Sequence, residues 1–186
     1  MRKQFLSGAL LCFAISVFGQ AQKSTDDLDF LLGQWQVKRT YSPNTQKERQ
    51  YEGTLSCAWA MDSTYIECSY IMERPEKKRG LDQVYFNYNS IYDQYESMWL
   101  SSTWPIKATS KGELIATGKN LEMSTSAEFP IQGGLTEFVK TTWEITWVED
   151  HYDISRQTFI RTNEDAEGDW FHHMNETLVY QAATKK

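Results

Sequence analysis

The chain is poor in the residues that interrupt regular structure. Its 186 residues include only 10 glycines, 4 prolines and 3 cysteines. This composition excludes collagen-like and low-complexity chains, and an aromatic content of 14% excludes a disordered one. No apolar run after residue 20 approaches the roughly 18 residues of a transmembrane helix, so we expect no membrane span. What remains is a single, aromatic-rich globular domain.

The N-terminus has the pattern of a secretory leader. A basic start, Met1-Arg2-Lys3, precedes an apolar run from about Phe5 to Phe18 and the small residue Gly19. We therefore expect residues 1–20 to be a signal peptide and the chain to be exported, either periplasmic or secreted. Without residues 1–19 the basic side chains fall from 19 to 17 (19 − 2 = 17), against 25 acidic ones. Such a charge repels phosphate backbones, and nucleic acid is a poor candidate partner.

Beyond residue 33 the dominant hydrophobic period is two, with turn residues between the alternating segments. A short helix over 26–33 precedes about nine or ten antiparallel strands. A meander of this many strands either stacks as a sandwich or closes into a barrel, and we favour the barrel. The predicted fold is all-β: one up-and-down antiparallel β-barrel over residues 26–182. A closed barrel of this size can hold one small ligand. The strands are expected near 34–41, 50–60, 65–73, 81–88, 92–102, 113–118, 121–128, 136–148, 152–160 and 170–181.

Two cysteines, Cys57 and Cys68, fall in one predicted hairpin that turns at Asp62-Ser63. This turn pairs residues whose numbers add up to 125 and sets the two cysteines opposite each other on the apolar face. A two-residue loop would place them at a hydrogen-bonded pair, which is unfavourable for a cross-strand disulfide. A four-residue loop would place them at the closer, non-hydrogen-bonded pair. The sequence leaves the disulfide open between these alternatives.

Two segments carry a resemblance to a known group. Residues 29–37, Asp-Phe-Leu-Leu-Gly-Gln-Trp-Gln-Val, resemble the short helix and Gly-x-Trp strand that begin lipocalins, nitrobindin-like haem proteins and a bacterial calycin-like family of unknown function. Residues 87–102, with a Tyr-Asp turn followed by Tyr-x-x-x-Trp, are similar to the last family's central signature. Asn89 stands where that family usually has Asp, and its terminal Tyr-x-Arg is reduced to Tyr180-Gln181. The resemblance implies a barrel with a central cavity and carries over no catalytic residue.

Three charged residues are predicted on interior faces: Arg39, Arg156 and Glu176. In a closed barrel the last strand pairs with the first, which would bring Glu176 near Arg39. A buried guanidinium needs a carboxylate or an anionic ligand. The group is therefore either a structural ion pair or an anchor for the polar part of a ligand.

Five tryptophans alternate onto probable interior faces. In a barrel, a core and an aromatic-walled pocket use the same faces, so the sequence does not separate these alternatives. As ligand-binding residues they would form the pocket walls. They are Trp35, Trp59, Trp99, Trp143 and Trp147.

The histidines offer a second hypothesis. His172 and His173 are adjacent on a predicted strand and point to opposite faces, so they cannot share one metal. We expect His172 to face inward, where it could ligate haem in the manner of the nitrobindin-like proteins. No metal-ligand spacing and no activated nucleophile are found, so enzymatic activity is uncertain and not favoured.

The leading hypothesis is thus an exported, lipocalin-like barrel that binds a small, partly apolar molecule without a cofactor. The alternatives are a haem-binding barrel, which could be enzymatic, and an envelope interaction module whose core is filled. Ligand identity and oligomeric state stay open.

Overall fold

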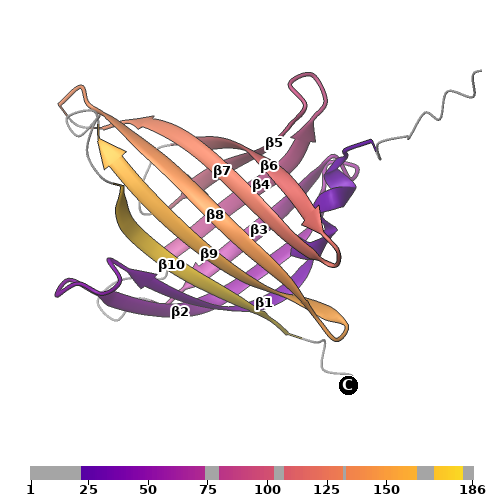
Figure 1. Ribbon diagram of the computed structural model, residues 1–186, viewed down its shortest axis with the longest axis horizontal. Helices are drawn as coiled ribbons and strands as arrows, with labels where there is room; N and C mark the ends of the chain where they lie inside the picture. Colours follow the sequence, from indigo (N-terminus) through magenta and orange to yellow (C-terminus); the bar gives the residue numbers. More distant parts are fainter. Residues whose placement is uncertain (1–21, 74–79, 103–106, 132, 163–169, 182–186) are drawn as a thin grey trace, which may run out of the picture.

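The protein forms a closed barrel of ten antiparallel strands, which confirms the predicted fold class (Figure 1). The computed structural model describes residues 22–73, 80–102, 107–131, 133–162 and 170–181. The predicted signal peptide lies outside the described residues. Each strand pairs with its neighbours in sequence, and β1 pairs with β10 to close the barrel. The strands are β1 (Gly33–Tyr41), β2 (Arg49–Ala60), β3 (Tyr65–Met72), β4 (Gly80–Asn89), β5 (Gln94–Ser101), β6 (Ala108–Thr117), β7 (Asn120–Pro130), β8 (Thr136–Val148), β9 (His151–Thr162) and β10 (Phe171–Tyr180).

A short 3₁₀ helix, η1 (Thr25–Leu31), packs at one end of the barrel, beside β3 and β4 (Figure 1). The Ser24 backbone N–H donates to the Asp27 carboxylate at 2.8 Å, which caps the helix N-terminus. The same carboxylate accepts a hydrogen bond of 2.6 Å from the Tyr95 hydroxyl on β5. Leu28 and Leu31 are buried under the helix, so η1 fills this end with its own apolar side chains.

The hairpin of β2 and β3 has the four-residue loop of the second alternative. Ala60 pairs with Tyr65, and the register sets Cys57 opposite Cys68. The two cysteines form a disulfide, with their Cα atoms 4.1 Å apart. This short separation is that of a non-hydrogen-bonded pair, so the loop length determines whether the sulfurs can meet.

β10 contains a register shift that changes the side on which its histidines lie. His172 pairs with Phe159, but Met174 pairs with Thr158, so His173 is an extra residue in the strand. The ring of His172 stacks on Phe159, which alternates with the inward Thr158, and His172 therefore lies on the outer face. The prediction that His172 faces inward is wrong, because a β-bulge reverses the alternation at this point. His173 faces inward instead.

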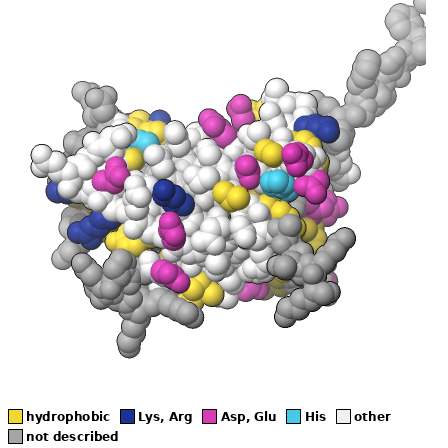
Figure 2. Space-filling view, turned by 90° about the horizontal axis from the view of Figure 1, so that it is seen from below, with side chains coloured by type: hydrophobic (Ala, Val, Ile, Leu, Met, Phe, Trp, Pro, Cys, Tyr) yellow, Lys and Arg dark blue, Asp and Glu magenta, His cyan; other side chains and the backbone are white. Residues whose placement is uncertain are grey.

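The outside of the barrel is mostly polar. On the face shown in Figure 2, acidic and basic side chains are interspersed with small groups of hydrophobic ones. Within the described ranges, no helix is both long and apolar enough to cross a membrane.

Candidate functional site

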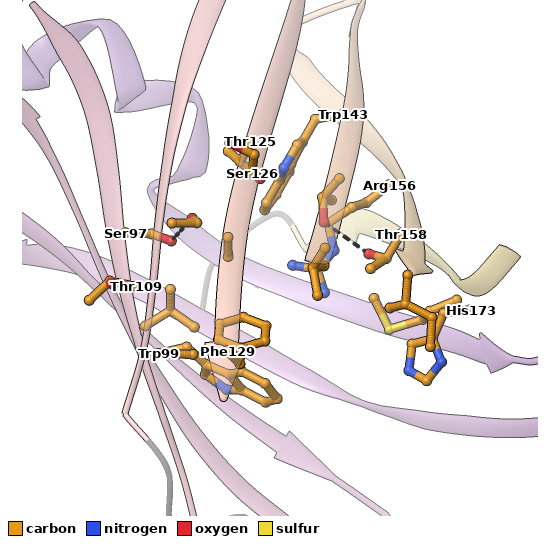
Figure 3. Close-up of a pocket in the computed structure, with 18 of the residues that line it drawn as sticks. Ser97, Trp99, Thr109, Thr125, Ser126, Phe129, Trp143, Arg156, Thr158 and His173 are labelled. Carbon is orange, nitrogen blue, oxygen red and sulfur yellow. Dashed lines mark hydrogen bonds between the residues drawn. The ribbon is translucent and has the colours of Figure 1, made fainter. Parts of the chain in front are cut away.

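A cavity of about 390 Å³ occupies the half of the barrel away from η1. Its walls include Tyr41 at the end of β1, Phe129 at the end of β7 and Glu137 at the start of β8. These strand ends lie opposite the end that η1 fills. Figure 3 shows side chains from several strands around this common space. The lining residues are Arg39, Tyr41, Tyr70, Val84, Phe86, Ser97, Trp99, Ala108, Thr109, Ser110, Thr125, Ser126, Ala127, Phe129, Glu137, Val139, Thr141, Trp143, Arg156, Thr158, Ile160, His173 and Met174.

A buried carboxylate joins the two cavity arginines. Glu176 accepts from Arg39 Nε at 2.5 Å and from Arg156 Nη2 at 2.8 Å. Its Oε1 also accepts from the Tyr70 hydroxyl at 3.2 Å. A second carboxylate, Asp82, lies 3.8 Å from Arg39 Nη1. Two cations thus face two carboxylates, and this part of the site is close to electrical neutrality.

The pKa shifts follow from burial and pairing. Burial alone would raise the pKa of the Glu176 carboxyl, but the charges of Arg156 and Arg39 hold it below its ordinary value. Burial opposes the charge of Arg39, yet Glu176 and the neighbouring phenols raise the pKa of that guanidinium. For Tyr70, burial and then the charge of Glu176 raise the pKa of the phenol. Arg39 and Glu176 therefore stay ionised, and Tyr70 stays a hydrogen-bond donor, at neutral pH.

Two donors on the cavity wall lack acceptors. Trp143 Nε1 and Arg156 Nε are buried, and neither has a hydrogen-bond partner among the described residues. The Arg156 guanidinium lies over the Trp143 ring, 4.8 Å from its centroid, so the two donors belong to one part of the wall. A buried donor without an acceptor costs about 1–3 kcal/mol. Because both residues line the cavity, a ligand oxygen that reached these donors would offset that cost.

The wall around these donors is mixed. Trp99 and Phe129 lie on one side of the cavity, and Trp143 with Arg156 on the other (Figure 3). Small hydroxyl side chains line the space between them. Burial raises the pKa of the Glu137 carboxyl and lowers that of the His173 imidazole, so burial favours the uncharged form of each.

The structure divides the predicted site residues into two groups. The residues that line the cavity are Arg39, Trp99, Trp143 and Arg156, with Glu176 buried directly behind the arginines. Its predicted closeness to Arg39 is found, since β1 and β10 pair these two residues.

The other three tryptophans lie at the η1 end and do not line the cavity. Trp35 is 1% exposed, and its Nε1 donates to the Leu31 carbonyl of the helix at 2.9 Å. Trp59 packs against the buried core near the end of β2. Trp147 lies edge-to-face with Tyr152 and under Lys119. Alternation places a side chain on the inner face, but its position along the strand determines whether it meets the cavity or the filled end.

Sequence reasoning missed several cavity residues. Glu137 lies on the inner face of the predicted strand over 136–148, whereas Phe129 lies one residue beyond the predicted strand over 121–128. His173 could not be found in this way, because no residue of β10 signals the bulge.

A histidine-bound haem through His172 does not fit this structure. His172 Nε2 is 2.6 Å from Asn175 Oδ1, and its ring stacks on Phe159 outside the barrel. In the part of the chain that the structure describes, no group of three or more metal-ligating side chains is found.

The fold and site define a class: a closed, up-and-down antiparallel barrel with an interior cavity. The chain belongs to the family described as "Protein of unknown function (DUF1579)", which matches residues 20–179. Among solved structures it is similar to the crystal structure of Rv2717c from M. tuberculosis, with a TM-score of 0.62 and 14% sequence identity. That match covers 84% of this chain and 96% of the other, and it shows a shared fold. The search of curated proteins found no match.

Proposed function

We propose that this protein is an exported, calycin-like barrel that binds a small, partly apolar molecule in its cavity. The observation that carries the proposal is the pair of buried donors on residues of a mixed, aromatic and hydroxyl-lined wall, Trp143 Nε1 and Arg156 Nε. A ligand oxygen would remove the cost of leaving them without an acceptor. The calycin placement rests on the ten-strand barrel with its short N-terminal helix.

The electrostatics of the site favour an uncharged ligand. The positive charges of Arg39 and Arg156 are already balanced by Glu176 and Asp82. An anionic group would gain little from this balanced set and would lose its hydration. We therefore propose a neutral molecule with an aromatic or branched apolar body and a carbonyl or hydroxyl oxygen.

Export is proposed on two grounds. The first 20 residues have the pattern of a signal peptide. The disulfide between Cys57 and Cys68 is of the kind that persists in oxidising compartments. N-terminal sequencing of the protein purified from its host would show a start near residue 20; an intact Met1 in the cell interior would contradict export.

The binding proposal can be tested with 6-propionyl-2-dimethylaminonaphthalene, a neutral fluorophore with one carbonyl. Its emission moves to longer wavelength when that carbonyl accepts a hydrogen bond. We expect saturable binding to the wild-type protein. Trp143→Phe should weaken binding by about threefold to tenfold, the equivalent of one hydrogen bond, and shift the bound emission to shorter wavelength.

A matched control is Trp35→Phe, which makes the same chemical change outside the cavity and should leave the affinity unchanged. N-phenyl-1-naphthylamine, which has no carbonyl, should bind wild type and Trp143→Phe equally. Absence of saturable binding by both fluorophores would contradict the proposed function.

A further inference from the structure

The ladder between β6 and β7 ends before the two strands do. Their ladder runs from Thr117, paired with Asn120, to Lys111, paired with Ser126, and ends there among the described residues. Both strands continue beyond this point: β6 back to Ala108 and β7 on to Pro130.

Each strand keeps its other neighbour along this stretch. β6 stays with β5, since Ser97 pairs with Ser110 and their hydroxyl oxygens are 2.7 Å apart. β7 stays with β8 as far as Pro130, which pairs with Thr136. Each strand thus keeps its other neighbour where the β6–β7 ladder has ended. We call this unpaired stretch, β6 before Lys111 and β7 after Ser126, the seam.

A second hollow, of about 680 Å³, lies on the outer surface at this seam. Its walls include the outward Met98 and Glu96 of β5, Tyr85 of β4 and Lys111 of β6. The inner cavity and the outer hollow share five lining residues, so the wall between them is one residue thick at this point. The shared residues are Ser97, Thr109, Ser110, Ser126 and Ala127.

The five residues that the cavity and the outer hollow share have small side chains. Ser97, Thr109 and Ser126 lie on the side of the cavity away from Arg156 and His173 (Figure 3). Four small hydroxyl side chains and the methyl group of Ala127 obstruct a passage less than the phenyl ring of Phe129 or the indole of Trp99 would. Ladder hydrogen bonds also do not hold the two strands together here.

We propose that the seam between β6 and β7 is the passage by which the ligand enters and leaves the cavity, and that the outer hollow is where it first binds. This inference rests on the proposed function. The outer hollow combines the thioether of Met98 with the amide of Gln94 and the phenol of Tyr85, which suits a neutral molecule with both apolar and polar parts.

The test closes the seam with a covalent link. In a full-length chain with Cys12→Ser, the pair Thr109→Cys and Glu128→Cys would be joined by a short bismaleimide. If the ladder continued in register, these positions would be the next outward pair after Lys111 and Ser126. Cys57 and Cys68 form a disulfide and do not react with the reagent. The control joins Glu113→Cys to Ser124→Cys, an outward pair inside the intact ladder.

A passage is a kinetic barrier, so closing it changes both rate constants and leaves the equilibrium unchanged. Stopped-flow measurements with the naphthalene ketone should show association and dissociation slowed at least tenfold by the 109–128 link, with the dissociation constant within about twofold of the unlinked protein. The 113–124 link should change neither rate.

Unchanged rates in the 109–128 protein would overturn the passage while leaving the proposed function standing. Loss of affinity with unchanged association would also overturn it, since the link would then have altered the bound state. Absence of binding before any link is made would contradict the proposed function itself.

Discussion

Replacing the cavity tryptophan by phenylalanine should have an unusual effect on stability. Trp143→Phe removes a buried N–H that has no acceptor among the described residues, whereas Trp35→Phe removes one that donates to the Leu31 carbonyl. Both changes delete about 40 Å² of buried apolar surface, which costs about 1 kcal/mol at about 25 cal/mol per Å². The two variants therefore differ chiefly in the fate of the N–H group.

The expected change in the free energy of unfolding differs between the two variants. Losing the unpartnered donor of Trp143 returns about 1–3 kcal/mol, so that variant should be as stable as wild type or up to about 2 kcal/mol more stable. Losing the hydrogen bond of Trp35 costs about 1 kcal/mol more, so Trp35→Phe should be about 2 kcal/mol less stable than wild type.

Urea unfolding followed by far-ultraviolet circular dichroism, with the m-value checked for constancy, measures both free energies. We expect a gap of at least about 2 kcal/mol between the variants. Equal destabilisation of the two proteins would refute the idea that the Trp143 donor is held at a cost for a ligand.

Three further predictions concern the interior and the hairpin. Glu176→Gln leaves two buried arginines without their shared carboxylate and should cost about 3–5 kcal/mol at pH 7 in urea unfolding. The pKa of Glu176 is lowered in the folded state, so its ionised carboxylate stabilises the fold above about pH 4.3, and this stabilisation is lost as pH falls through the folded pKa. A difference in the free energy of unfolding between Glu176→Gln and wild type that stays constant below pH 4 would contradict this prediction. Burial lowers the pKa of His173, so wild type should lose stability as pH falls below about 6.5, and the loss should be smaller in His173→Gln; parallel pH profiles would rule out this contribution. The double variant Cys57→Ala with Cys68→Ala removes a disulfide between residues 11 apart in the sequence and should be about 2–3 kcal/mol less stable than wild type. Unchanged stability of the double variant would contradict this prediction.

The barrel architecture could be predicted from the sequence because the alternation of side chains along a strand can be read within each short segment. Alternation over β1 and β10, together with closure of the meander, correctly brought Arg39 beside Glu176. The same reasoning paired Cys57 with Cys68, but the disulfide depended on the loop length, which alternation does not determine.

The candidate site was harder to predict, because it depends on depth along the barrel and on irregularities. Trp35 and Trp147 face inward as expected, yet they lie where η1 and the strand ends fill the interior. Their place near the turns at the helix end could have shown this. The bulge at His173 and the end of the β6–β7 ladder at Lys111 arise from long-range pairing, which a local pattern does not encode.

The central claim is that the cavity holds a ligand, and native mass spectrometry of the protein from its own host tests it most directly. Val139→Trp places an indole in the cavity, and circular dichroism of that variant checks that it stays folded. We predict a noncovalent complex with a neutral small molecule in wild type, lost in Val139→Trp while that protein stays folded. Ligand-free protein alone in wild type, or a complex that survives in Val139→Trp, would contradict the account.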